Sequence, residues 1–117
     1  LRVVLDRSDP KPSGVYPFRL YEDMDRVIQA TLLLRGSLTE GDEVEVKLNG
    51  VPMALSLLGS VDATYMINQP PDVRWYPVPP EAMLYGENQL SITLTSGDPQ
   101  ATGEIVIDEV EIWVQPK

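Results

Sequence analysis

The sequence predicts an all-β protein, either an antiparallel β-sandwich or a β-barrel. Apolar and polar residues alternate with a period of two in several short runs, as they do in strands that bury one face. Asn49-Gly50 separates two of these runs, and both residue types tolerate the positive φ of a tight hairpin turn. Eleven Pro and eight Gly interrupt the chain so often that no helical periodicity persists. Roughly seven or eight short strands follow, and the lack of strand–helix alternation excludes a parallel α/β fold.

The first part of the chain contains two predicted strands and one predicted loop. Residues 2–6 form a short alternating run. Residues 27–35 are almost uniformly apolar, which indicates a strand covered on both faces, and a short helix is the alternative. Residues 10–24 contain three Pro and one Gly, so we expect a long loop there, and residues 59–72 are expected to form a second one.

The middle of the chain predicts a β-hairpin. In residues 42–48 three aliphatic side chains share one face, and residues 51–58 return after the Asn49-Gly50 turn. Pro52 has no amide proton to donate to a neighbouring strand. The returning strand is therefore expected to lie at a sheet edge or to end early.

Three more strands are predicted in the last part of the chain. Residues 73–78 end at a group of Pro residues, and residues 89–95 alternate until the turn residues Ser96–Pro99. Residues 104–115 form the last strand, but their apolar positions change phase at Asp108-Glu109. Either a β-bulge lies there or the strand crosses from one sheet to the other.

The composition limits the chemistry that the chain can perform. Its 117 residues suit a single domain spanning residues 1–117, and 43% hydrophobic with 23% charged residues is ordinary for a globular protein. The absence of His and Cys excludes a Ser-His-Asp triad, thiol nucleophiles, disulfides and the common zinc, copper and iron sites. We therefore expect no enzyme activity, no catalytic residue and no cofactor.

The formal net charge of −9 bears on the partners of the protein. A chain this acidic repels phosphate backbones and anionic lipid, so we expect no nucleic-acid partner. No stretch approaches the roughly 20 apolar residues of a spanning helix, so we expect no membrane insertion. The chain begins at Leu1 without a visible signal peptide, which suggests a piece of a longer or processed protein.

Three segments occur in an order that is typical of one family: Val44–Gly50, Trp75–Leu84 and Tyr85–Leu94. The first ends a strand in Leu-Asn-Gly, and the third contains a Gly-Glu-Asn turn that leads directly into an alternating strand. Ile107–Val114 is similar to the closing strand of that family. Over roughly residues 27–115 the chain resembles the galactose-binding-like jelly-roll domains of glycoside hydrolases, such as the non-catalytic sandwich of β-galactosidase-type enzymes.

The resemblance implies that the sandwich is a jelly roll and that the chain is an accessory domain excised from a larger protein. Such a domain binds a glycan weakly or packs against the adjoining catalytic domain. The alternative is a purely structural or adhesive cell-surface sandwich with protein partners and no glycan ligand. The absence of Cys leaves the compartment open, and we slightly favour an extracellular or cell-surface location in a bacterium.

Candidate carbohydrate-binding residues follow from the chemistry of sugars, which are recognised by flat aromatic faces and planar polar groups. Trp75 and Tyr76 are adjacent on a predicted strand, so they face opposite ways, and one of them is expected to join the core. Arg74 points to the same side as Tyr76, and Tyr65 lies in the nearby loop. The alternative is an aromatic side chain that fills the end of the sandwich.

Trp113 is out of phase with the aliphatic residues around it on the last strand. We expect it on the opposite face from them. An exposed Trp at this position predicts contact with a neighbouring domain, whereas a Trp covered by a loop belongs to the core.

Two acidic groups are candidate sites. The resemblance implies that Asp23, Asp25 and Glu109 could hold a structural calcium ion, and the alternative is a solvated turn. We expect no metal site and no dependence of folding on divalent metal. The run Glu40–Glu45 is interpreted as a solvated face that resists edge-to-edge pairing of strands.

Overall fold

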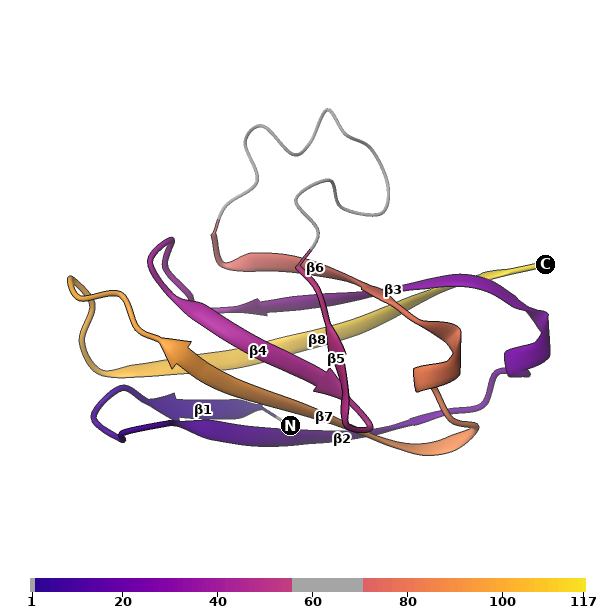
Figure 1. Ribbon diagram of the computed structural model, residues 1–117, viewed down its shortest axis with the longest axis horizontal. Helices are drawn as coiled ribbons and strands as arrows, with labels where there is room; N and C mark the ends of the chain where they lie inside the picture. The colour runs from indigo at the N-terminus through magenta and orange to yellow at the C-terminus, as the bar shows by residue number, and fades with distance from the viewer. Residues whose placement is uncertain (1, 56–70) are drawn as a thin grey trace.

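The computed structural model describes residues 2–55 and 71–117, and these residues form a β-sandwich of two antiparallel four-stranded sheets (Figure 1). The strands are β1 (Val3–Asp6), β2 (Ser13–Leu20), β3 (Val27–Gly36), β4 (Glu43–Leu48), β5 (Val51–Met53), β6 (Val73–Val78), β7 (Gly86–Ser96) and β8 (Glu104–Pro116). Within the described residues, two single 3₁₀ turns, η1 (Met24–Arg26) and η3 (Pro80–Ala82), lie between strands. The all-β prediction is confirmed.

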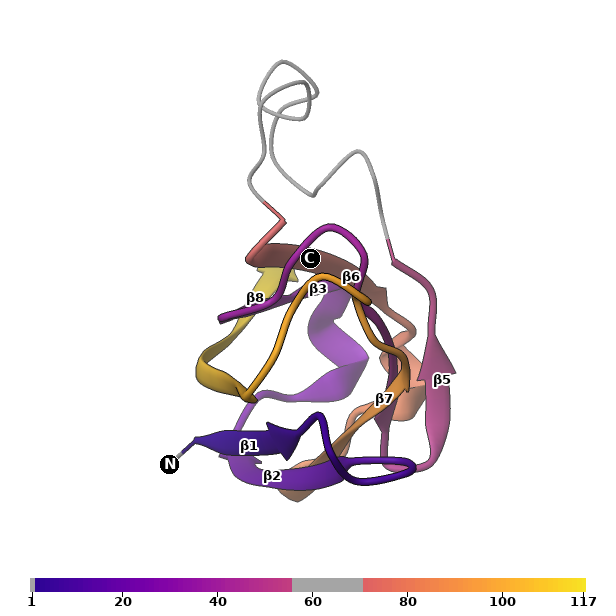
Figure 2. The ribbon, with the colours of Figure 1, turned by 90° about the vertical axis from the view of Figure 1, so that its left-hand side faces the viewer.

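The order of the strands is that of a jelly roll. Sheet A contains β1, β8, β3 and β6, and sheet B contains β2, β7, β4 and β5. Each strand of the first half pairs with one of the second half: β1 with β8, β2 with β7, β3 with β6, and β4 with β5. The chain is therefore one long antiparallel hairpin whose successive strand pairs go to alternate sheets. β1 and β2 lie next to each other where the chain passes between sheets (Figures 1 and 2).

The core fills the space between the inner faces of the two sheets. Alternate side chains of the strands point into it, as the period-two pattern predicts. Each large aliphatic side chain buried in this way contributes about 1.5–3 kcal/mol to stability. The buried apolar residues of the core are Val3, Leu5, Val27, Ala30, Leu32, Leu34, Leu38, Val46, Leu48, Met53, Tyr76, Val78, Ala82, Met83, Leu90, Ile92, Leu94, Ile105 and Ile107.

The predicted hairpin is confirmed. Leu48 pairs with Val51, so Asn49 and Gly50 are the two turn residues, with φ values of 50° and 83°. β5 is an edge strand that ends at Met53, as Pro52 predicted.

β3 is a strand, and the alternative of a short helix is wrong. It lies between β8 and β6 in sheet A, which explains its continuous apolar sequence.

The loop predicted over residues 10–24 is wrong, because it contains β2. The inward side chains Tyr16, Phe18 and Leu20 pack partly against the core. Pro17 favoured a loop in the sequence. A proline is tolerated at this position because β2 is an edge strand of sheet B. The predicted loop over residues 59–72 lies largely outside the described residues.

β8 contains the β-bulge that the change of phase predicted. Arg35 pairs with Glu109 but Gly36 pairs with Ile107, so Asp108 is an extra residue on β8. The strand stays in sheet A, which rules out a crossing between sheets. The bulge reverses the side-chain alternation, and Trp113 therefore points away from the core.

Candidate functional site

The outer face of sheet A carries two tryptophans that meet across the central strand. Trp75 on β6 and Trp113 on β8 have ring centroids 4.9 Å apart and an interplanar angle of 80°. Between them on β3, Leu33 pairs with Trp75 and Thr31 pairs with Trp113. Leu33 lies on this outer face, apart from the core, yet only 3% of it is exposed. We call Thr31, Leu33, Trp75 and Trp113 the tryptophan face.

The tryptophan face has an apolar centre and a polar rim. Trp113 is 44% exposed, which confirms that it lies outward on the last strand. At the rim, a nitrogen of the Arg35 guanidinium lies 2.7 Å from a carboxylate oxygen of Glu109. Tryptophan and arginine are enriched at the residues that contribute most to binding in protein–protein interfaces.

The structure separates the residues predicted to bind carbohydrate. Tyr76 is 2% exposed in the core, where burial raises the pKa of its hydroxyl. Arg74 is also buried, and its Nη2 donates to the carbonyl oxygen of Thr39 at 2.9 Å. Trp75 points to the outer face, opposite to both, so it shares no surface with them. Tyr65 lies outside the described residues, and glycan binding by this set stays a prediction.

The acidic residues considered for calcium do not meet. Asp23 caps η1, where its Oδ1 accepts from the backbone amide of Asp25 at 3.1 Å. Glu109 pairs with Arg35 near the far end of β3, eight residues beyond Val27, or about 26 Å along the strand. Within residues 2–55 and 71–117 no three acidic side chains cluster as metal ligands. Metal-independent folding remains a prediction.

The interpretation of the run Glu40–Glu45 as a solvated face is wrong for Asp42. This residue is buried, with only 2% of it exposed. Its two carboxylate oxygens accept from Nη1 and Nη2 of Arg7 at 2.6 and 2.7 Å. The backbone amides of Thr39 and Asp98 donate to it at 2.8 and 2.9 Å. The neighbouring Glu43 is exposed, as predicted.

The electrostatics of this cluster follow from its hydrogen bonds. Burial alone would raise the pKa of Asp42. The Arg7 guanidinium and the amides of Thr39 and Asp98 outweigh burial and hold that pKa well below its usual range. Asp42 therefore stays ionised and joins three loops at one end of the sandwich.

Two asparagines join the hairpin turn to the start of β7. Asn88 is 1% exposed, and its Oδ1 accepts from Nδ2 of Asn49 and the backbone amide of Leu84, at 2.8 and 2.9 Å. Oδ1 of Asn49 accepts from the backbone amide of Gln89 at 2.9 Å. Both side chains are fully used within the fold, which assigns them a structural role.

The outer face of sheet B carries a second group of side chains, which the sequence-based reasoning missed. Tyr21 and Tyr85 are 63% and 68% exposed, with ring centroids 5.6 Å apart. They lie just beyond the end of β2 and just before the start of β7, next to the outward pair Arg19 and Glu87. Recognising β2 as a strand would have placed Tyr21 beside Tyr85.

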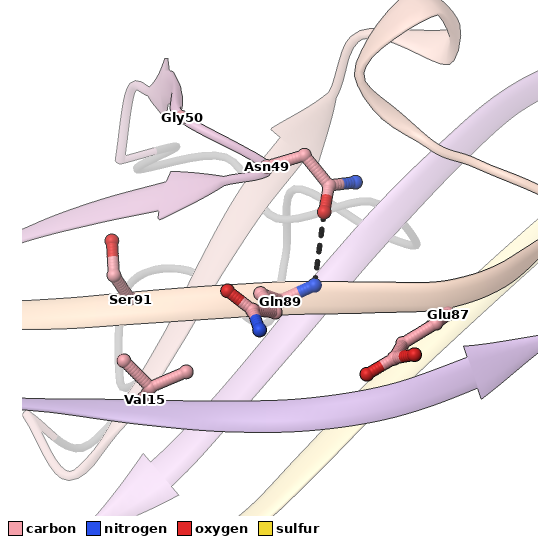
Figure 3. A pocket seen from close by; sticks show the side chains of 6 residues that line it. All are labelled: Val15, Asn49, Gly50, Glu87, Gln89 and Ser91. Carbon is pink, nitrogen blue, oxygen red and sulfur yellow. Dashed lines mark hydrogen bonds between the residues drawn. The ribbon is translucent and has the colours of Figure 1, made fainter.

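Further along β7 lies an open hollow of about 590 Å³, which neither tyrosine lines. Figure 3 shows Glu87, Gln89 and Ser91 along β7, with Val15 of β2 on one side and the Asn49-Gly50 turn on the other. We call the row Val15, Arg19, Tyr21, Tyr85, Glu87, Gln89 and Ser91 the tyrosine face.

Comparisons with known proteins assign no family, since no family model matches the chain and no curated protein is significantly similar to it. In the described part of the chain, no helix is long and apolar enough to cross a membrane. Function is therefore inferred from the two outer faces of the sandwich.

Proposed function

We propose that this chain is a non-catalytic accessory domain of a glycoside-hydrolase-like protein, and that its tryptophan face packs against the adjoining catalytic domain. One observation carries the proposal: Trp113 is 44% exposed on the outer face of sheet A, in contact with Trp75. A neighbouring domain that covered these rings would remove a large apolar area from water. The jelly-roll fold and the resemblance in sequence support the carbohydrate-active context.

The chemistry of the tryptophan face favours a protein partner over a sugar. A sugar needs planar polar groups beside the aromatic rings to bind its hydroxyls. Here Arg35 and Glu109 bind each other, and the hydroxyl-bearing Thr31 is 7% exposed. Apolar contact is therefore the main interaction that the centre of this face offers.

The state of the buried carboxylate Asp42 supports a role without catalysis. A general acid or base works best when its pKa lies near the working pH. Asp42 has the opposite shift, and both of its oxygens are occupied by Arg7 and backbone amides. The sequence offers no His or Cys to take the role instead.

Side-chain reactivity tests the packing of the tryptophan face. Hydroxyl-radical labelling read by mass spectrometry should modify Trp113 readily in the 117-residue chain. In a polypeptide that also carries the proposed adjoining domain, labelling of Trp113 should fall several-fold, because that domain would cover the ring. Tyr85 is the internal control, since it is 68% exposed on the opposite sheet.

Two outcomes would count against the proposal. Equal labelling of Trp113 in both contexts would show that no domain of the same polypeptide covers it. Protection that appears only after a separate protein is added would favour the adhesive cell-surface alternative.

A further inference from the structure

We propose that Tyr21 and Tyr85 form a site of oxidative modification, at which a one-electron oxidant joins the two rings into dityrosine and thereby locks the edge strand β2 to β7. The oxidant is of the class that a haem peroxidase produces from hydrogen peroxide. Three observations carry this inference: the contact of the two rings, their exposure to solvent, and their place at the end of the β2–β7 ladder. None of them depends on the proposed function.

The two rings already lie in contact. The centroids of Tyr21 and Tyr85 are 5.6 Å apart, and the rings meet edge to face with an interplanar angle of 71°. Among residues 2–55 and 71–117, no other two tyrosine rings are in such contact. Two radicals formed on these rings are therefore neighbours within one molecule.

Both rings are accessible to an oxidant. Tyr21 and Tyr85 are 63% and 68% exposed, whereas Tyr76 is 2% exposed in the core. Exposed side chains change rotamer within picoseconds to nanoseconds, so the rings can turn from their edge-to-face contact until the carbons beside the two hydroxyls meet. The net charge of −9 keeps separate copies of the chain apart, which favours a link within one chain over a link between two.

The backbone keeps the two residues side by side. Leu20 and Gly86 form the last pair of the β2–β7 ladder, and Tyr21 and Tyr85 are the next residues outward. The buried Asn88 fixes the chain around Tyr85, because its Nδ2 donates to the carbonyl oxygens on either side of that residue at 2.8 and 3.2 Å. The contact of the rings therefore follows from the register of the sheet.

The reaction balances as a two-electron oxidation. Each phenol gives up one electron and the proton of its hydroxyl, and one molecule of hydrogen peroxide takes up both electrons and both protons to form two molecules of water. The two phenoxyl radicals then form one carbon–carbon bond between the ring carbons beside their hydroxyls. The hydrogen on each of these carbons moves as a proton to the phenolic oxygen of the same ring, which restores both phenols. The linked chain is therefore lighter by two hydrogen atoms.

The link closes a long covalent loop. Tyr21 and Tyr85 stand 64 positions apart in the sequence (85 − 21). A cross-link over such a loop restricts the unfolded chain, as a disulfide does. β2 is an edge strand that pairs with β7 alone in sheet B, so the link also holds the end of this ladder. The melting temperature of the linked protein should therefore rise by roughly 10 °C.

Oxidation of the 117-residue chain by a haem peroxidase and hydrogen peroxide, at low protein concentration, tests the proposal. Dityrosine fluorescence should appear in the monomer, and peptide mapping by mass spectrometry should join Tyr21 to Tyr85. In Tyr21→Phe and in Tyr85→Phe this link should be lost, because phenylalanine keeps the ring but has no hydroxyl proton to give up. Tyr16→Phe is the matched control, since Tyr16 packs inward from β2, and it should give the wild-type yield.

Several results would overturn the inference. They are dityrosine that forms only between two chains, a peptide map that joins a different pair of tyrosines, and an unchanged yield in either of the first two variants. Calorimetry of the linked protein tests the lock, with oxidised Tyr85→Phe as the baseline because it undergoes the other oxidations but not this link. Equal melting temperatures would show that the link does not hold β2 to β7. None of these results would alter the labelling of Trp113, so the proposed function is tested separately.

Discussion

Asp42→Ala is expected to lower the free energy of unfolding by about 3–5 kcal/mol, as for other broken buried ion pairs. The substitution leaves Arg7, whose side chain is only 10% exposed, without its partner. It also leaves the backbone amides of Thr39 and Asp98 without an acceptor. For a domain of this size the melting temperature should fall by roughly 10–20 °C.

Chemical denaturation in urea measures this effect, and Glu43→Ala is the matched control. Glu43 is the next residue in the chain, but it is exposed, so its replacement should change stability by no more than about 0.5 kcal/mol. Similar losses in the two variants would show that the Arg7–Asp42 pair does not hold the loops together.

The same pair should make stability depend on pH. The pKa of Asp42 is lowered in the folded state, so its stabilising contribution is complete above the unfolded-state value of about 3.9. It is lost as the pH falls below that value towards the folded-state pKa. Below about pH 4, the urea concentration at the unfolding midpoint should therefore fall as the pH is lowered. It should fall less in Asp42→Asn. Asp98, whose pKa is lowered chiefly by the Thr39 hydroxyl, contributes to the dependence that remains.

Gly36→Ala is expected to destabilise the fold by about 3 kcal/mol, at the upper end of the cost of overpacking. Gly36 lies opposite the bulge at Asp108. A Cβ at Gly36 would overlap the carbonyl oxygen of Val106 and would lie 2.8 Å from Cα of Ile107. Both are backbone atoms, so the clash cannot be relieved by a change of rotamer.

Gly97→Ala is the matched control for Gly36→Ala. A Cβ at Gly97 would meet its nearest neighbours at 3.6 Å, which is ordinary van der Waals contact. Its effect on the urea midpoint should correspond to no more than about 0.5 kcal/mol. If Gly36→Ala were equally mild, the backbone at the bulge would have room for a Cβ atom, contrary to the distances given above.

The bulge connects the sequence to the proposed function. Ile105 and Ile107 point inward before it, and Ile112 packs against the core after it. Without the extra residue, Trp113 would point into the sandwich. The change of phase is visible in the sequence, so the outward position of Trp113 could be predicted from local pattern alone.

Other features depend on contacts that no local pattern contains. Asp42 looks like one member of an acidic run, but its partner Arg7 lies 35 residues away in the sequence. The distinction between a solvated and a buried carboxylate arises only when the loops meet at the end of the sandwich.

The tyrosine face was missed for a related reason. Pro17 made β2 resemble a loop, and without β2 nothing placed Tyr21 beside Tyr85. Proline signals a break in a central strand but is compatible with an edge strand. The position of a strand in the sheet is a property of the whole fold.

The effect of Trp113→Ala on thermal stability, measured by calorimetry in two contexts, tests the packing of the tryptophan face most directly. In the 117-residue chain the ring is 44% exposed, so its loss should cost about 1 kcal/mol, chiefly contact with Trp75. In a polypeptide that also carries the adjoining domain of our proposal, the same change should destabilise the sandwich by about 2 kcal/mol more, because the proposal places Trp113 at the centre of an interface. An equal loss of stability in both contexts would contradict the account.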